Sequence, residues 1–129
     1  MKQNLILLLA CLATRIALAE PSLAEKNAAE NAAIKKEWES WNAPFRPFRL
    51  IGNIHYVGAS GISSFLITTP EGHILLDTGF ETTVPRIRES VTKLGFRFTD
   101  IKIILNSHAH LDHAGGEDIV APSATPLGI

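Results

Sequence analysis

At 129 residues, the chain is long enough for one domain of ordinary size. Its hydrophobic content of 46% and net charge of -1 indicate a soluble globular protein, and they exclude a disordered chain or a strongly basic nucleic-acid-binding protein. The single cysteine, Cys11, lies in a predicted leader. The rest of the chain therefore has no disulfide and no thiolate to offer a metal.

The first nineteen residues have the pattern of a secretion signal. Lys2 gives a positive start, residues 5–13 form an apolar run too short to cross a bilayer, and residues 17–19 have the small-x-small pattern of a cleavage site. We therefore predict that residues 1–19 are a signal peptide, that the mature protein begins at Glu20, and that it is periplasmic.

A lipoprotein is the competing interpretation of the same segment. In it, residues 8–11 (LLAC) are a processing site, and an acylated Cys11 anchors the protein to a membrane. The apolar segment before Cys11 is short, which favours the soluble exported form without a membrane anchor.

Residues 20–42 are predicted to be an N-terminal arm rich in Ala, Glu, Lys and Asn. Within it, Ile34, Trp38 and Trp41 are spaced to share one side of a short helix. Prolines then break any helix and introduce the folded region, which we place at residues 43–129.

Three strands are expected next, at residues 53–57, 62–69 and 73–77. The first two are rich in β-branched and aromatic residues, and the turn-forming stretches GASG and PEG separate the three. This order suggests an antiparallel meander.

A helix is expected after the meander, at residues 84–94. Its apolar residues recur at helical spacing: Val84, Ile87, Val91 and Leu94. Thr82 or Thr83 can cap its start, and Gly95 is placed to end it. Residues 101–105 (IKIIL) then form a nearly continuous apolar run, typical of a strand covered on both faces.

The stretch NSHAHLDHAGG, residues 106–116, follows that strand and carries three of the five histidines. His108 and His110, two residues apart, can project to the same side of an extended segment and reach one cation. Asp112 and His113 offer a carboxylate and a third imidazole to a second cation. Imidazole and carboxylate without thiolate suit zinc, and also tolerate iron or manganese.

The glycines that end this stretch, Gly115 and Gly116, would let the backbone turn tightly beside the metals. His55 and His73 each stand alone in a predicted strand, so we interpret them as hydrogen-bonded structural residues. Asp77 has two open interpretations: it caps a turn, or it approaches the metal loop as a partner of a ligand.

Two motifs carry a family resemblance. Residues 108–113 (HAHLDH) resemble the HxHxDH signature of the metallo-β-lactamase fold, and residues 75–79 (LLDTG) resemble its early aspartate turn. Residues 41–80 are similar to the opening of the subclass B3 metallo-β-lactamases, and His113 belongs to the B3 pattern. Glyoxalase II and related thioesterases share HxHxDH. Their thioester substrates are cytoplasmic, so the secretion signal argues against a thioesterase.

The resemblance implies an α/β fold, namely the N-terminal half of a metallo-β-lactamase αββα sandwich. It also implies two Zn²⁺ ions per complete enzyme, with His108 and His110 binding the first and Asp112 and His113 the second. A metal-bound hydroxide would hydrolyse the amide bond of a small-molecule β-lactam, and Asp112 would orient the nucleophile.

The chain departs from the family after Gly116. In the B3 pattern each zinc takes a further histidine from the second half of the sandwich, and no histidine follows His113 here. We therefore expect residues 43–129 to be a partial metallo-β-lactamase domain. We expect the family activity to belong to the complete enzyme, and the chain itself, whether it is a partial sequence or a truncated gene product, to be catalytically inactive.

Overall fold

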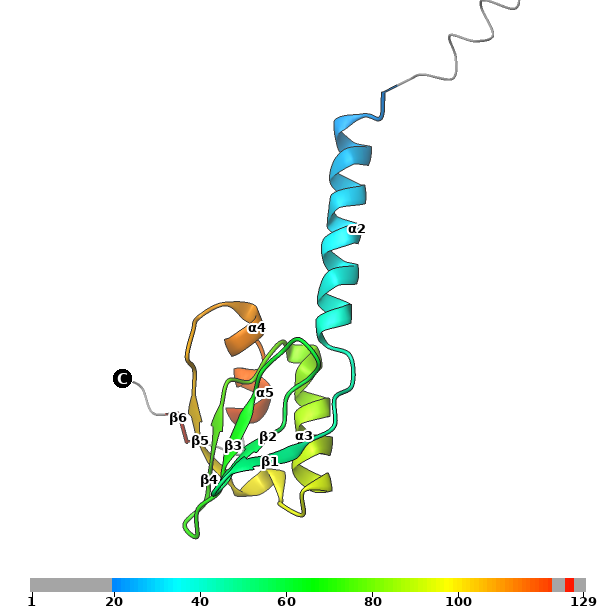
Figure 1. Cartoon of the computed structure of the whole chain (residues 1–129). Helices are drawn as coiled ribbons and strands as arrows, with labels where there is room; N and C mark the ends of the chain where they lie inside the picture. The colour runs from blue at the N-terminus through cyan, green and yellow to red at the C-terminus, as the bar shows by residue number, and fades with distance from the viewer. Residues whose placement is uncertain (1–19, 122–124, 127–129) are drawn as a thin grey trace, which may run out of the picture. The chain divides into compact units, whose positions relative to one another are not determined.

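The computed structural model describes residues 20–121 and 125–126 (Figure 1). The predicted signal peptide lies outside the described residues. The chain divides into two compact units, Met1–Lys35 and Lys36–Ile129. Among the described helices, none combines the length and the apolar character needed to cross a lipid bilayer.

The predicted arm forms helix α2 (Leu23–Trp41), which is longer than the short helix expected. Ser22 and Glu25 start it with a reciprocal cap: the Glu25 backbone N–H donates to Ser22 Oγ at 3.3 Å, and the Ser22 backbone N–H donates to Glu25 Oε2 at 2.7 Å. No residue of α2 is buried, so local capping and propensity define this helix more than packing does.

The second unit is built on a mixed sheet whose strands follow one another in chain order. The first four strands pair antiparallel, and the last three of them form the meander that the sequence predicted. These strands are β1 (Phe48–Ile51), β2 (Ile54–Tyr56), β3 (Phe65–Ile67) and β4 (His73–Leu76). Strand β1 was not predicted, and it forms because Gly52, at φ 53°, turns the chain back towards β2.

A helical crossover joins β4 to a parallel neighbour, β5 (Ile101–Leu105). It consists of a 3-10 turn (Glu81–Thr83), helix α3 (Val84–Lys93) and a second 3-10 turn (Phe98–Asp100). Gly95, at φ 87°, follows the end of α3 as predicted. Thr83 makes no side-chain cap to α3; its Oγ1 instead accepts a hydrogen bond from the Phe80 backbone N–H.

The chain ends in short elements, α4 (Leu111–Ala114), α5 (Glu117–Val120) and β6 (Thr125–Pro126). The sequence predicted neither α5 nor β6, because segments of four and two residues show no periodicity. Strand β6 pairs parallel with β5.

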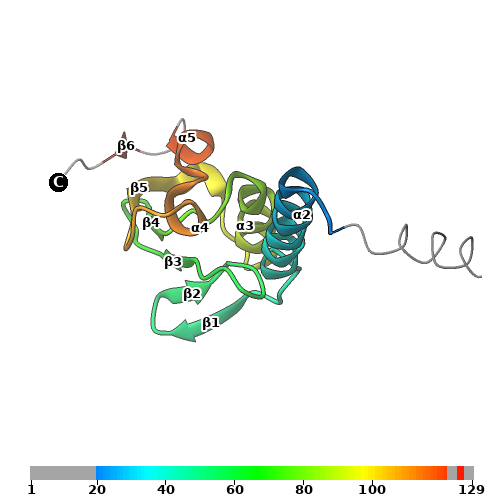
Figure 2. The ribbon, with the colours of Figure 1, turned by 90° about the horizontal axis from the view of Figure 1, so that it is seen from above.

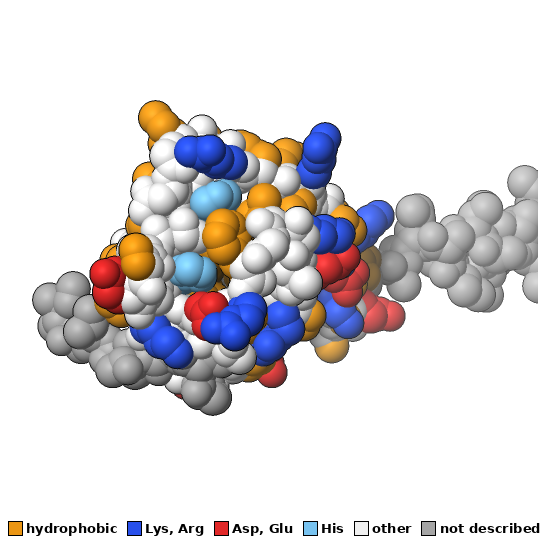
Figure 3. Space-filling view, turned by 90° about the horizontal axis from the view of Figure 1, so that it is seen from below, with side chains coloured by type: hydrophobic (Ala, Val, Ile, Leu, Met, Phe, Trp, Pro, Cys, Tyr) orange, Lys and Arg blue, Asp and Glu red, His pale blue; other side chains and the backbone are white. Residues whose placement is uncertain are grey.

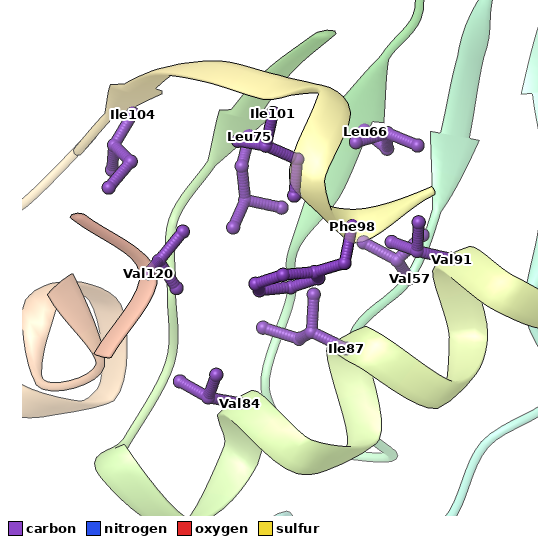
Figure 4. Packing of buried hydrophobic residues seen from close by; sticks show 10 residues of the cluster. All are labelled: Val57, Leu66, Leu75, Val84, Ile87, Val91, Phe98, Ile101, Ile104 and Val120. Atoms are coloured by element: carbon purple, nitrogen blue, oxygen red, sulfur yellow. The ribbon is translucent and has the colours of Figure 1, made fainter. Parts of the chain in front are cut away.

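The core lies between one face of the sheet and helix α3 (Figures 2 and 4). Three of the four predicted stripe residues of α3 are fully buried there, and Leu94 packs against them in part. The core residues are Val57, Leu66, Leu75, Val84, Ile87, Val91, Phe98, Ile101, Ile104 and Val120. Burying a side chain of this size stabilises the fold by about 1.5–3 kcal/mol.

The opposite face of the sheet is also apolar but less covered. The pairing aligns one row through Phe48, Tyr56, Phe65, Leu76 and Leu105. All of these side chains are half-buried or exposed in the described chain. The expectation that β5 is covered on both faces is therefore wrong for the described residues, because helices cover only the α3 face.

Candidate metal centre

Strand β4 ends in a strained residue that faces the histidine loop. Asp77 has φ 61° and is the only non-glycine residue with positive φ in the described part of the chain. Its backbone N–H donates to the Leu105 carbonyl at 2.8 Å, which joins the ends of β4 and β5. Asp tolerates this left-handed conformation better than most residues, and such strain is often kept at functional sites.

The buried Asp77 carboxylate is bound by the histidine loop. It accepts hydrogen bonds from the Ser107 backbone N–H and Oγ, both at 2.7 Å, and it lies 3.0 Å from His113 Nδ1. Burial alone would raise its pKa, but the bonds from Ser107 and His113 together hold the pKa of Asp77 below its ordinary value. Of the two interpretations of Asp77, the structure shows the contact with the loop.

Backbone hydrogen bonds fix the loop to the turn after β4. The His113 carbonyl accepts from the backbone N–H groups of Thr78 at 2.7 Å and Gly79 at 3.1 Å. In return, the Gly116 backbone N–H donates to the Gly79 carbonyl at 3.0 Å and to Thr78 Oγ1 at 3.1 Å. The turn at residues 76–79, which we call the LDTG turn, therefore fixes the position of α4.

Gly115 and Gly116 matter for a different reason from the one predicted. Their φ values, -63° and -95°, are ordinary for any residue, so no tight glycine turn is present. A Cβ on Gly116 would instead lie 2.3 Å from Val84 Cγ2, and one on Gly115 would lie 2.5 Å from the Leu111 carbonyl. The two glycines allow close packing of the loop against its neighbours.

The loop brings the four predicted ligands together. The rings of His108 and His110 have centroids 4.1 Å apart, and those of His108 and His113 are 5.3 Å apart. His113 Nε2 lies 3.4 Å from Asp112 Oδ2. His108 and His110 are exposed, whereas Asp112 and His113 are half-buried, so all four are at least partly accessible to solvent.

The donors suit zinc in their chemistry, but they do not form a complete site. No group of three or more His, Cys, Asp or Glu residues within the described ranges is arranged to hold an ion. A carboxylate only accepts hydrogen bonds, so the contact with Asp77 places the His113 proton on Nδ1 and leaves the Nε2 lone pair free. His113 is thereby oriented as a metal ligand would be.

His55 and His73 lie away from this loop. His73 begins β4 opposite Ile101, the first residue of β5, whereas the loop leaves the other end of β5. Both rings contact Phe96 edge-on, at centroid distances of 4.9 Å for His55 and 5.4 Å for His73. On the surface seen from below in Figure 3, histidine side chains lie among apolar and basic side chains. The contacts agree with a packing role for both rings. The predicted hydrogen bonding is found for His73, whose Nδ1 accepts from the Thr69 backbone N–H at 3.4 Å, but not for buried His55 Nδ1, which has no hydrogen-bond partner in the described residues.

A cavity of about 390 Å³ adjoins the loop. It is lined by Trp38, Trp41, Phe80, His110, Leu111 and Asp112. The sequence did not indicate Phe80, Leu111 or Ser107 as site residues, because their roles depend on contacts with distant parts of the chain. The Asp77 contact with Ser107, for example, joins residues thirty positions apart.

Comparison with known proteins agrees with this geometry. The family model described as "Metallo-beta-lactamase superfamily" matches residues 57–121, which include the LDTG turn and the whole histidine loop. The chain belongs to the metallo-β-lactamase superfamily. The chain also resembles solved members of the family in three dimensions.

Three of these structures illustrate the similarity. Rm3 metallo-β-lactamase is 48% identical with a TM-score of 0.67, over 70% of this chain and 34% of that one. Native FEZ-1 from Legionella gormanii is 48% identical with a TM-score of 0.63, over 65% and 32%. MEM-A1, a subclass B3 enzyme from a soil metagenome library, is 44% identical with a TM-score of 0.63, over 67% and 33%.

The predicted resemblance to subclass B3 and the predicted fold class are thus confirmed. The sheet and helices match the N-terminal part of metallo-β-lactamase structures. This metallo-β-lactamase chain spans about a third of the length of the structures that it matches.

Proposed function

We propose that this chain contributes the first half of the zinc site of an exported, subclass B3-type β-lactam hydrolase. The arrangement of His113 carries the proposal: Asp77 fixes its tautomer, and the LDTG turn fixes its backbone. Identities of 42–48% to metallo-β-lactamases support the substrate class.

His108 and His110 would hold one Zn²⁺ ion, and Asp112 and His113 a second. When bound, zinc supplies a Lewis acid and a water molecule whose pKa is lowered towards neutrality. Asp77 keeps the His113 proton on Nδ1, and the half-buried Asp112 carboxylate can accept a proton from the attacking water and orient it. The remaining ligands would come from outside this chain.

A hybrid enzyme tests these roles. Residues 20–116 of this chain would be joined to the remaining, C-terminal part of native FEZ-1, and hydrolysis of a chromogenic cephalosporin would be measured. In the hybrid, His110→Ala and Asp112→Ala should each lower kcat/KM by orders of magnitude, because each removes a ligand.

His55→Gln is the matched control, since His55 is buried beside Phe96 at a distance from the loop. It should leave kcat/KM within a few fold of the parent. If His55→Gln were as damaging as His110→Ala, the assignment of metal and structural histidines would be wrong.

A further inference from the structure

The face of the sheet opposite α3 carries two aligned apolar rows. One is the row described above, from Phe48 to Leu105. Successive residues of a strand point to opposite faces, so the residues two positions away on β2 to β5 share this face. The strand pairing aligns them with a residue of β1 into a second row, made only of isoleucines: Ile51, Ile54, Ile67, Ile74 and Ile103. We call the two rows together the open face.

The open face differs from the covered face in burial and not in the kind of side chain. On the covered face, Leu66 and Leu75 are fully buried beneath α3. On the open face, Phe48 and Ile51 are 41% and 68% exposed, and the remaining side chains are half-buried. Figure 2 shows α3 on one side of strands β1–β4 and no helix on the other. Within the described residues, this apolar surface is left in contact with water.

The aromatic part of the open face needs no polar partner. The rings of Phe48 and Tyr56 stack at a centroid distance of 5.5 Å and an interplanar angle of 19°, and Phe65 contacts Tyr56 edge-on at 5.6 Å. The Tyr56 hydroxyl donates to the Ala59 carbonyl within the chain. The one polar group of the two rows is therefore satisfied, and an apolar surface is the fitting partner.

Charge narrows the choice of partner. Neither row contains a Lys, Arg, Asp or Glu residue, and Arg49 of β1 pairs with His55 in a row of the covered face. Anionic lipid surfaces and nucleic acids are held by basic side chains, which the open face lacks. A second neutral, apolar face leaves no charge buried without a partner, and a second copy of this chain supplies one.

The size of the open face also suits a second copy. The adjoining Phe45 and Leu50 are 51% and 53% exposed. Covering them together with the two rows would remove roughly 700 Å² of surface from water in each copy, and a standard interface buries about 800 Å² per partner. Monomers rarely expose a continuous apolar patch larger than about 300–600 Å².

Pairing through the edge of the sheet is less favourable than pairing through its face. Strand β1 is an edge strand, but Pro47 beside it has no backbone N–H, and its register shifts between Arg49 and Ile51. Short, irregular edges of this kind resist the addition of a further strand. Two copies would therefore meet as stacked sheets, about 10 Å apart.

We propose that two copies of this chain form a symmetric dimer through their open faces. The same surface lies on both sides of the contact, so the dimer closes about a two-fold axis and adds no third copy. The apolar side chains of the two faces interdigitate, as they do between the sheets of a β-sandwich. The pairing needs no metal and goes beyond the proposed function.

Sedimentation equilibrium of the full chain tests the dimer. The chain has a mass of 14.0 kDa and would be measured from about 1 to about 200 μM. EDTA in the buffer prevents histidines of two copies from sharing a metal ion. The apparent mass should rise with concentration from that of one chain to that of two and then stay constant.

Two substitutions and a control locate the contact. Ile51→Glu and Phe48→Glu each place a carboxylate in the interface, so each should raise the Kd of the dimer by about tenfold or more. Ile51 is so exposed that its replacement should not alter the far-UV circular dichroism spectrum. Leu23→Glu changes an aliphatic side chain that is 74% exposed on α2, and it should leave the Kd unchanged.

The mass of one chain at every concentration, or an association that survives both substitutions of the open face, would overturn the dimer. A mass that rises beyond two chains would indicate open-ended pairing and overturn it too. So would a monomer that co-sediments with phosphatidylglycerol vesicles and loses this binding in Ile51→Glu, because lipid would then cover the face. The measurement uses neither substrate nor zinc, so its outcome is separate from that of the hybrid enzyme.

Discussion

Asp77 combines three properties at a single residue. It ends a strand in a left-handed conformation, it is buried, and its carboxylate is bound by Ser107 and His113. The left-handed backbone and the burial of a carboxylate both cost free energy, and the hydrogen bonds from Ser107 and His113 offset that cost, so the residue is specified by the site as well as by the fold. An aspartate suits this position because both of its carboxylate oxygens are in contact with Ser107 or His113.

Replacing Asp77 with Asn removes the charge of the side chain but keeps a residue that tolerates the left-handed backbone. Asn also tolerates positive φ and can accept from the Ser107 N–H, but it has no second carboxylate oxygen for His113 Nδ1. We expect Asp77→Asn to lower the free energy of unfolding by about 1–3 kcal/mol, and Asp77→Ala by more. Urea unfolding of the chain measures this. Asp118→Asn, at an exposed position, is the control; an Asp77→Asn midpoint equal to that of the control would contradict the role.

The grouping of the four proposed ligands could be predicted from the sequence because their spacing is local; their binding of a metal stays a prediction. His108, His110, Asp112 and His113 fall within six residues, so one loop is enough to bring them together. Ser107 and Phe80 could not be predicted, since neither has a local pattern. Their roles follow from contacts with Asp77 and Trp38, which lie far away in the sequence.

Among the helices and strands, the sequence predicted best those with a clear pattern of apolar residues. Helix α3 has an apolar stripe and a terminal glycine, and β5 has an unbroken apolar run, so both were placed within a residue or two. Strand β1 was missed because all four of its residues are exposed and no alternation marks it. Strand β1 forms because it pairs with β2, and such a pairing leaves no local pattern in the sequence.

The docking of α4 depends on a glycine without unusual backbone angles. Gly116→Ala would place a methyl group 2.3 Å from Val84 Cγ2 and 3.0 Å from the Thr78 carbonyl oxygen. Because φ at Gly116 is ordinary, any loss of stability reports this crowding alone. We expect the free energy of unfolding to fall by about 1–3 kcal/mol in urea unfolding.

A second substitution tests that explanation. Val84→Ala removes the nearest methyl groups, so in the double variant Gly116→Ala should cost less than it does alone. Strictly additive effects would show that Val84 is not the source of the crowding. Gly52→Ala, where no atom lies within 4 Å but φ is 53°, gives the cost of backbone strain for comparison.

At the scale of the molecule, the described residues leave one face of the sheet covered and the other open. The α3 face holds the core, whereas the opposite face carries the apolar row from Phe48 to Leu105. The histidine loop lies at the end of the same sheet, and in the described residues no group of three or more possible ligands is arranged to hold an ion.

We therefore expect the chain alone to show no turnover. With two protein ligands for each ion, zinc should bind weakly and hold water poorly, and misplacement by about an ångström can cost on the order of a hundredfold in rate. Cephalosporin and carbapenem hydrolysis would be assayed with excess zinc, beside the hybrid as a positive control. Turnover by the chain alone that a chelator abolishes would mean that unidentified ligands complete the site.

The predicted export also concerns the whole molecule. The pattern at residues 17–19 predicts cleavage before Glu20 and a periplasmic product. Mass spectrometry of the protein recovered from a periplasmic fraction should give the mass of a chain beginning at Glu20. A lipid-modified N-terminal Cys11 in the membrane fraction would instead establish the lipoprotein.

The order of the strands in the sheet is also their order in the chain, from β1 to β6. Each strand therefore finds its partner already present as the chain lengthens. The antiparallel pairings from β1 to β4 close only short loops, which favours rapid folding, whereas the pairing of β5 with β4 closes the longer crossover through α3. The histidine loop comes after β5, so its anchor, the turn at residues 76–79, precedes it in the chain. The metal ligands should consequently be acquired late: in refolding kinetics, protection of the amides at Thr78, Gly79 and Gly116 should follow protection of the β2–β4 meander.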